Sequence, residues 1–97
     1  MKLDILVFGA HPDDVELGCG GTIIKHIKQG LKVGIIDLTM GEMGTRGTPE
    51  IRALEAEQAM KIIGANFREN LKMSDSFVDL SKESINKVVK VIRTHRP

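Results

Sequence analysis

The sequence predicts an α/β protein with a Rossmann-like, three-layer fold, in which a parallel sheet has helices on both of its faces. One observation is the order of segments: short apolar runs alternate with stretches of helical periodicity, giving strand, helix, strand, helix, strand, helix. Another is that capping and terminating residues stand where these helices should begin and end. Because strand–helix–strand crossovers are right-handed, this order gives a sheet with the strand order 3-2-1.

The first strand is expected over residues 4–9, an apolar and partly β-branched run of the kind that is buried on both faces of a parallel sheet. Residues 10–21 are rich in glycine, proline and aspartate, so we expect a loop there. The first helix is expected over residues 22–29, where isoleucines recur at helical spacing, and Gly30 is a typical terminating residue.

The second strand is expected over residues 32–38, followed by a glycine-rich loop over residues 39–47. Thr48 followed by Pro49 is typical of a helix N-terminus, because threonine caps the first turn and proline fits the first helical position. This second helix should end before Gly64.

A short third strand is expected within residues 67–73. Ser81 is a suitable N-cap for a last helix, whose apolar positions 85, 88, 89 and 92 fall on one face and which should end near His95. These elements account for the chain without an internal repeat or a linker, so we expect a single domain.

The composition excludes several classes of function. The formal net charge is +1, and there are only three Phe and no Trp or Tyr, so we expect neither nucleic acid nor a membrane surface as a partner. The single cysteine cannot form an intrachain disulfide, and the apolar runs fall far short of the ~20 residues of a membrane span. The N-terminus lacks the features of a signal peptide, so we expect a cytoplasmic protein.

The predicted sheet has an open edge. The sequence ends after a helix, where a doubly wound fold would begin its next strand, and the apolar first strand would lie at an unpaired edge. We therefore expect residues 1–97 to be the N-terminal portion of a larger single domain, or partner chains to cover that edge.

The loop after the first strand contains the residues best suited to catalysis. His11, Asp13 and Asp14 lie within four positions, at the edge where parallel α/β sheets bind ligands. Pro12 favours an extended His11, so His11 and Asp14 could converge on one cation. An imidazole nitrogen and a carboxylate oxygen suit zinc first and iron(II) second, and Asp13 would be free to accept a proton. A divalent metal beside such a carboxylate is typical of amide or ester hydrolysis.

Two other interpretations fit parts of this segment. The aspartates could be turn formers and helix caps. Alternatively, a glycine-rich loop after the first strand and Asp37 at the end of the second are features of a nucleotide-binding half-domain. Residues 18–23 lack the third glycine of that fingerprint, and the acidic side chains of the loop would repel a pyrophosphate.

Residues 10–18, AHPDDVELG, and 20–22, GGT, resemble the signature of the PIG-L/LmbE-like deacetylases. The likeness continues through DLT at 37–39, GE at 41–42, GT at 47–48, Arg52 and Glu55, NL at 70–71 with Asp75, and VIR with RP at 91–97. Within that family the sequence looks most like the deacetylases of bacillithiol biosynthesis, which act on N-acetylglucosaminyl-malate. It corresponds to the N-terminal part of a typical member.

The resemblance implies a role for individual residues. It makes His11 and Asp14 zinc ligands and Asp13 the general base that activates water. Arg52 matches a family arginine that contacts the substrate, and Asp75 is a second candidate for substrate binding. The implied substrate is a small N-acetyl amino sugar conjugate, and the implied assembly is a homo-oligomer.

One part of the family pattern is absent. The resemblance implies a third zinc ligand in an H-x-D-H-like segment and a downstream histidine that supports the oxyanion, and neither occurs in the 97 residues. His26 and His95 should lie near the opposite edge of the sheet, as surface or helix-end residues, and Cys19 is expected to be a small buried residue. A chain without independent activity is therefore a further alternative.

Overall fold

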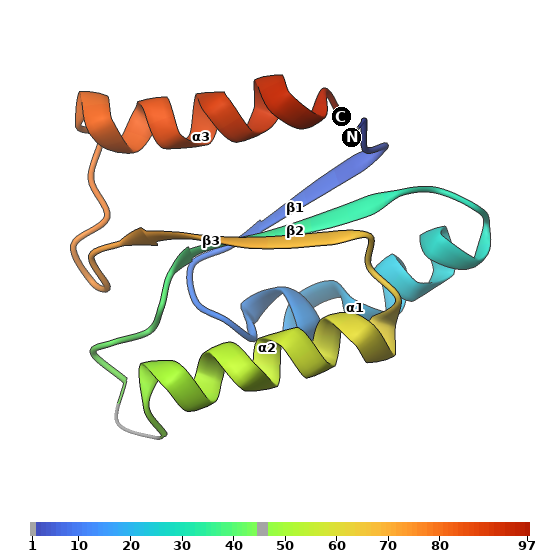
Figure 1. Cartoon of the computed structure of the whole chain (residues 1–97), viewed down its shortest axis with the longest axis horizontal. Coiled ribbons are helices and arrows are strands. Elements are labelled where there is room, and N and C mark those ends of the chain that lie inside the picture. The colour runs from blue at the N-terminus through green and yellow to red at the C-terminus, as the bar shows by residue number, and fades with distance from the viewer. Residues whose placement is uncertain (1, 45–46) are drawn as a thin grey trace.

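The computed structural model describes residues 2–44 and 47–97, so positions 45 and 46 of the expected second loop lie outside the described residues. The described elements, in chain order, are β1 (Ile5–Gly9), α1 (Asp14–Lys28), β2 (Val33–Thr39), α2 (Pro49–Ile63), β3 (Phe67–Met73) and α3 (Lys82–His95). The strands are parallel and ordered β1-β2-β3, which confirms the predicted order. Helices α1 and α2 lie on one face of the sheet and α3 on the other (Figure 1).

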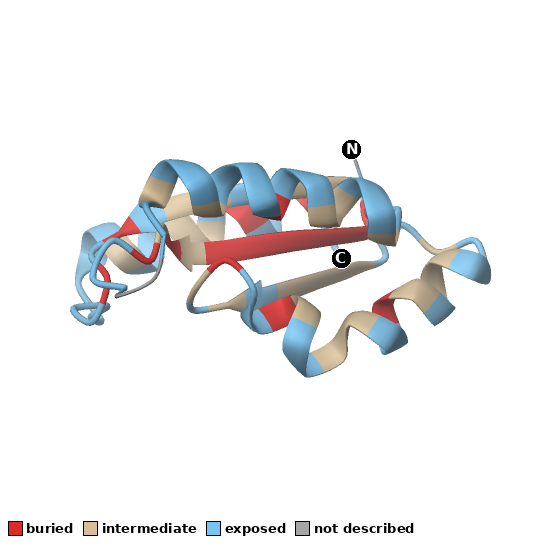
Figure 2. Cartoon of the chain, turned by 90° about the horizontal axis from the view of Figure 1, so that it is seen from below, coloured by how far each residue is buried: buried red, intermediate tan, exposed pale blue. Residues whose placement is uncertain are grey.

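The central strand β2 lies in the core. All of its residues except Leu38 are buried, because β1 and β3 flank it and helices cover both faces (Figure 2). Ile35 pairs in register with Val7 on one side and Arg68 on the other. The main apolar cluster joins β2 to α1 and to the connection between α2 and β3, and it comprises Val15, Ile23, Val33, Ile35 and Ala65.

Helix α1 begins much earlier than expected. It starts at Asp14, inside the segment predicted to be a loop, and its backbone departs from helical geometry only at Cys19, where φ is −148°. The glycines around Cys19 made this segment look like a loop, since each lowers helix propensity by about 1 kcal/mol. Burial of Val15 and Ile23 on the sheet side offsets that cost. The candidate catalytic residues therefore lie at a helix N-terminus.

The first strand is less buried than expected. Most of β1 is half-buried and Phe8 is 37% exposed, so the prediction of a strand buried on both faces is wrong. The reason is its position: β1 is an edge strand, hydrogen-bonded only to β2 among the described strands. Its apolar composition suits a more central place in a sheet.

The remaining boundaries confirm the capping signals. The side chain of Thr48 accepts a hydrogen bond from the backbone N–H of Ile51, and Gly64 ends α2 in the left-handed conformation with φ of 85°. Ser81 caps α3 in the same way, accepting from the N–H of Ser84. The third strand is a full seven residues, with an irregular register opposite the end of β2.

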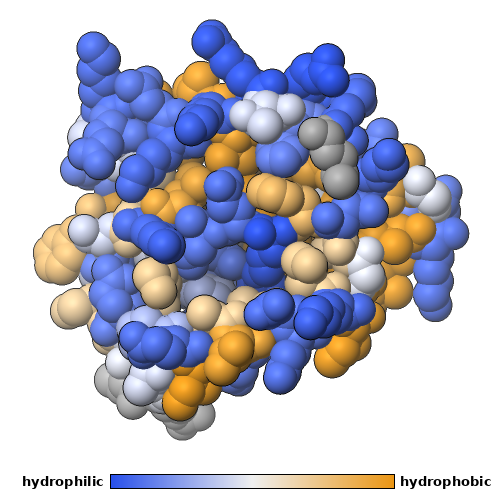
Figure 3. Space-filling model, in the orientation of Figure 1, coloured by the Kyte–Doolittle hydropathy of each residue, from blue (hydrophilic) through white to orange (hydrophobic). Residues whose placement is uncertain are grey.

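Figure 3 shows a face of the molecule that is mostly polar and is interrupted by several apolar patches. Among the helices of the described part, none has the length and apolar content needed to span a bilayer.

Candidate active site

His11 and Asp14 face each other across the turn that leads from β1 into α1. The backbone N–H of His11 donates to Oδ2 of Asp14 at 3.0 Å, and the His11 Nδ1 atom lies 3.3 Å from the same oxygen. The second separation is at the long end for a hydrogen bond. It matches the spacing of about 3.3–3.4 Å between two ligands held at about 2.0–2.1 Å on one tetrahedral zinc. These two residues therefore fit the metal predicted for them.

The other ring nitrogen of His11 points to Asp75. Nε2 lies 2.6 Å from Oδ1 of Asp75, a residue 64 positions away in the loop after β3. Burial alone would raise the pKa of Asp75, but hydrogen bonds from Met43 and His11 outweigh it, and the pKa is lowered. The hydrogen bond with Asp75 raises the pKa of His11 despite the opposing effect of burial.

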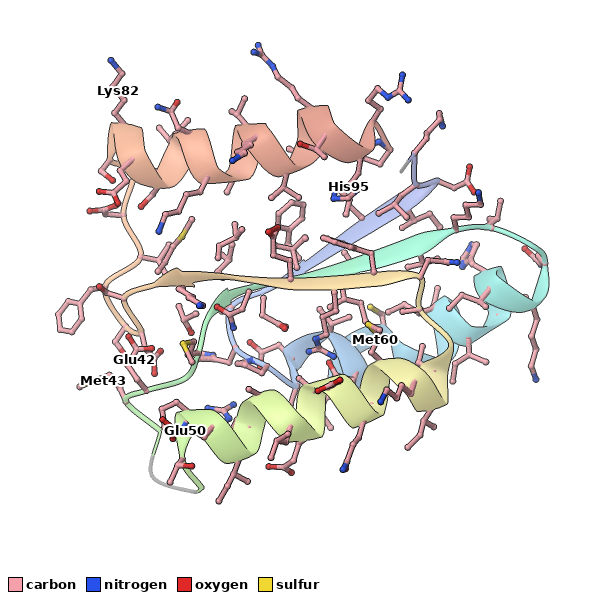
Figure 4. All side chains as sticks on the ribbon, in the orientation of Figure 1. Glu42, Met43, Glu50, Met60, Lys82 and His95 are labelled. Atoms are coloured by element: carbon pink, nitrogen blue, oxygen red, sulfur yellow. The ribbon has the colours of Figure 1, made fainter. Side chains whose placement is uncertain are left out.

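Asp75 also joins the loops after β2 and β3. Its Oδ2 accepts a hydrogen bond from the backbone N–H of Met43 at 2.8 Å, and its own N–H donates to Oε2 of Glu42 at 3.0 Å. Figure 4 places Glu42 and Met43 beside the loop that follows β3. Glu42 belongs to the segment that resembles the family, and its carboxylate holds the backbone of Asp75 in place.

Asp13 has a strained backbone. It precedes α1 with φ of 148°, a value that residues with a side chain rarely adopt. Its carboxylate is 54% exposed and lies 3.6 Å from the Arg52 guanidinium. Loss of solvent raises the pKa of Asp13, Arg52 opposes this, and Asp14 and Glu16 add to the increase. A carboxylate that is exposed to the pocket and easier to protonate suits the predicted proton acceptor.

Arg52 is not a solvated helix residue. From the first turn of α2 its guanidinium, 18% exposed, reaches across the site and donates to the carbonyls of Gly41 and Pro12 at 3.3 and 3.4 Å. It therefore ties α2 to the loops after β1 and β2. Together with His11, Asp13, Asp14 and Asp75, it lines an open pocket of about 340 Å³ at the carboxyl ends of the strands.

A buried ion-pair cluster lies next to this pocket, and sequence reasoning missed it. Arg68 of β3 donates to both oxygens of Asp37 at 2.7 and 2.9 Å and to Glu16 of α1 at 3.1 Å. Burial opposes the charge of Arg68, but its hydrogen bonds to Asp37 and Glu16 outweigh this effect and raise the pKa of Arg68. Burial also raises the pKa of Asp37, and Arg68 opposes that increase. The short bidentate geometry favours an ion pair, with both side chains charged.

The other candidate residues lie away from the pocket. His26 bonds to the carbonyl of Thr22 near the end of α1. His95 is at the end of α3, as expected, but it is buried against Phe67, with ring centres 4.3 Å apart, and it is far from Glu42 and Met43 in Figure 4. Cys19 is half-buried, so the expectation of a buried residue is wrong. Within residues 2–44 and 47–97, no three His, Cys, Asp or Glu side chains are grouped so that they could hold a metal ion.

The fold and the pocket define a Rossmann-like α/β protein with a candidate metal-dependent hydrolytic site. The family model described as PIG-L, GlcNAc-PI de-N-acetylase, matches residues 6–97. The chain belongs to this family.

Several curated proteins are similar in sequence to this chain. The uncharacterized deacetylase YaiS of Escherichia coli K12 is 33% identical over 94% of this chain and 55% of its own length. The diacetylchitobiose deacetylase of Thermococcus kodakarensis is 34% identical over 96% of this chain and 38% of its own. The chain thus spans about half or less of the curated relatives it matches.

Solved structures agree on the fold. The conserved protein TT1542 of Thermus thermophilus has a TM-score of 0.91 and 47% identity, over 98% of this chain and 43% of that protein. The N,N'-diacetylchitobiose deacetylase of Pyrococcus horikoshii has a TM-score of 0.88 and 30% identity, over 96% and 38%. A third neighbour, with 27% identity and a TM-score of 0.84 over 100% and 45%, is a 4-carboxy-2-hydroxymuconate hydratase of Pseudomonas putida. The fold therefore supports more than one reaction.

Proposed function

We propose that this chain is the N-terminal portion of a single-domain deacetylase that removes the acetyl group from an N-acetylglucosaminyl conjugate. The observation that supports this most strongly is the 3.3 Å separation of the His11 and Asp14 ligand atoms, with Asp13 and Arg52 on the same pocket. The names of the deacetylase relatives agree with the reaction. N-Acetylglucosaminyl-malate, the bacillithiol precursor, is the proposed substrate within that class.

Each residue has a distinct part in the proposal. His11 and Asp14 would hold zinc, with iron(II) as the second choice, and the ion would polarise the acetyl carbonyl and make water more acidic. Asp13 would take the proton from the attacking water. Arg52 would hold a carboxylate or sugar hydroxyls of the substrate, a task suited to its planar guanidinium. The resemblance also implied a substrate contact for Asp75, but the carboxylate of Asp75 is buried and bonded to His11 and Met43.

A catalytic zinc normally has three protein ligands, and His11 and Asp14 are two. We propose that the third comes from polypeptide outside these 97 residues, as the family resemblance implies. The nucleotide-binding alternative is less well supported. Asp37, which would bind a ribose, has both oxygens occupied by Arg68.

Homo-oligomerisation is also part of the proposal, since the half-buried β1 edge is open to a partner. Light scattering of the purified chain tests this part separately.

The test is release of acetate from N-acetylglucosaminyl-malate and, for comparison, from N,N'-diacetylchitobiose. Zinc-loaded protein that extends through an H-x-D-H segment should produce acetate and free amine in equal amounts. The 97-residue chain should bind zinc more weakly and turn over far more slowly. No acetate from either compound, with hydration of an unsaturated acid instead, would contradict the proposal.

A further inference from the structure

We propose that Asp75 is a positioning residue: it accepts a hydrogen bond from Nε2–H of His11 and so leaves Nδ1 free, as a ligand atom facing Asp14. This inference rests on the proposed metal site. It gives Asp75 a task different from the substrate contact that the sequence suggested.

The two ring nitrogens of His11 lie at clearly different distances from their carboxylate neighbours. Nε2 and Oδ1 of Asp75 are 2.6 Å apart, which is a short, charge-assisted hydrogen bond. It is also too short for two atoms that share a tetrahedral zinc, which would lie about 3.3–3.4 Å apart. Nδ1 and Oδ2 of Asp14 have that longer spacing. The ring therefore presents one nitrogen to a hydrogen-bond acceptor and the other to a metal.

The neutral imidazole has one proton, on either nitrogen. The Asp75 carboxylate only accepts, so a hydrogen bond to it requires the proton on Nε2. A carboxylate that binds the far side of a ligating histidine fixes the tautomer and ring orientation and increases ligand basicity.

Asp75 is itself held firmly enough for this task. It is 3% exposed, and its Oδ2 accepts from the N–H of Met43 at 2.8 Å. Its backbone N–H donates to Glu42 at 3.0 Å. With these partners, only Oδ1 faces His11. A buried, fully engaged carboxylate has little freedom to follow a sugar hydroxyl, which is what a substrate contact would need.

The decisive variant is Asp75→Asn, because asparagine keeps the shape but can turn either its oxygen or its NH₂ toward Nε2. Asp79→Asn is the matched control: it makes the same chemical change in the same loop, on a side chain that bonds to Ser81 and Ser84. Circular dichroism would establish that both variants fold.

The first readout needs no metal. Nitrogen-15 NMR of the histidine rings in the full 97-residue chain, above the His11 titration, reports the tautomer, and a His11→Gln variant identifies the His11 signals. The wild type and Asp79→Asn should have the proton on Nε2, and Asp75→Asn should lose this preference. A wild-type His11 with its proton on Nδ1 would overturn the inference even if no variant folds.

The second readout is zinc affinity by competition with a chelator. Asp75→Asn should weaken zinc binding by about 10–100-fold, as other substitutions of such partners do. Unchanged zinc affinity together with an unchanged tautomer, and only a raised KM, would overturn the inference and restore the substrate contact. Absence of zinc binding by wild-type protein that extends through an H-x-D-H segment would instead contradict the proposed function, while the tautomer result would still decide the role of Asp75.

Discussion

Arg68 and Asp37 form a bidentate pair that joins β3 to β2 directly beneath the first turns of α1. Their side chains are 7% and 3% exposed, and the two hydrogen bonds measure 2.7 and 2.9 Å. The same guanidinium reaches Glu16, two residues beyond the proposed ligand Asp14. The pair therefore supports the helix end on which the candidate site is built.

Arg68→Ala should destabilise the fold by about 3–5 kcal/mol, because it leaves the buried Asp37 carboxylate without its partner. Urea denaturation measures the loss. Lys61→Ala is the control, since it breaks an exposed pair with Glu57 at 3.8 Å and should cost less than about 0.5 kcal/mol. Similar losses of unfolding free energy in the two variants would show that the buried pair stabilises the fold no more than the exposed pair does.

Asp13→Gly should raise stability while it abolishes turnover. The strained φ of 148° destabilises the folded chain by about 1–3 kcal/mol, and glycine would relieve this strain. Glycine also has greater freedom in the unfolded chain, which lowers the gain by about 0.5–1 kcal/mol. A net gain of about 1 kcal/mol is expected in urea. Asp13→Ala keeps the Cβ atom, so it should lose turnover without this gain, and both variants should keep zinc. Normal turnover in either would remove Asp13 as the base.

Gly41→Ala should weaken substrate binding through Arg52. Gly41 has φ of +67°, and a Cβ atom there would overlap the Arg52 guanidinium, so the side chain must move. We expect an increase of about tenfold in the Kd for N-acetylglucosaminyl-malate, roughly one charge-assisted hydrogen bond. Calorimetry measures this.

Gly47→Ala is the matched control for that variant. Its φ is +70°, but the nearest atoms to an added Cβ, including Cγ of Arg52, are 3.9 Å away. Both variants should lose about 1–2 kcal/mol of stability to the left-handed backbone. Equal effects on Kd would mean that Arg52 is not the cause.

The His11–Asp75 pair should stabilise the metal-free chain in a defined pH window. The pKa of His11 is raised from 6.5, so its contribution is complete below pH 6.5 and is lost as pH rises through the folded value. The pKa of Asp75 is lowered from 3.8, so its contribution is complete above pH 3.8 and is lost as pH falls through the folded value. The difference in unfolding free energy between the wild type and Asp75→Asn should be largest between these limits. A difference that does not vary with pH would contradict this pairing.

The fold was predictable because its signals are local. The helix caps and terminators each involve neighbours within a few positions: Thr48, Gly64 and Ser81. They predicted the bounds of α2 and the start of α3 to within about a residue. The start of α1 was not predictable in this way. Three glycines argue for a loop, and only burial of Val15 and Ile23 against the sheet overrides them.

The site was predictable only in outline. His11 and Asp75 were expected at one edge because both follow parallel strands, but no spacing rule gives a hydrogen bond across 64 positions. Arg68 meets Asp37 across 31 positions and Glu16 across 52, so it carried no local signal at all. In the sequence, Arg68 is only a polar residue of a predicted strand, and its ion pair with Asp37 becomes evident only when β2 and β3 are side by side.

Asp75 touches the connections that follow β1 and β2 while it belongs to the one that follows β3. If any one strand has not yet joined the sheet, the candidate metal site is incomplete, even when the helices have formed. The amount of zinc bound should consequently follow the fraction of molecules in which all three strands are paired, so that zinc binding reports on completion of the sheet.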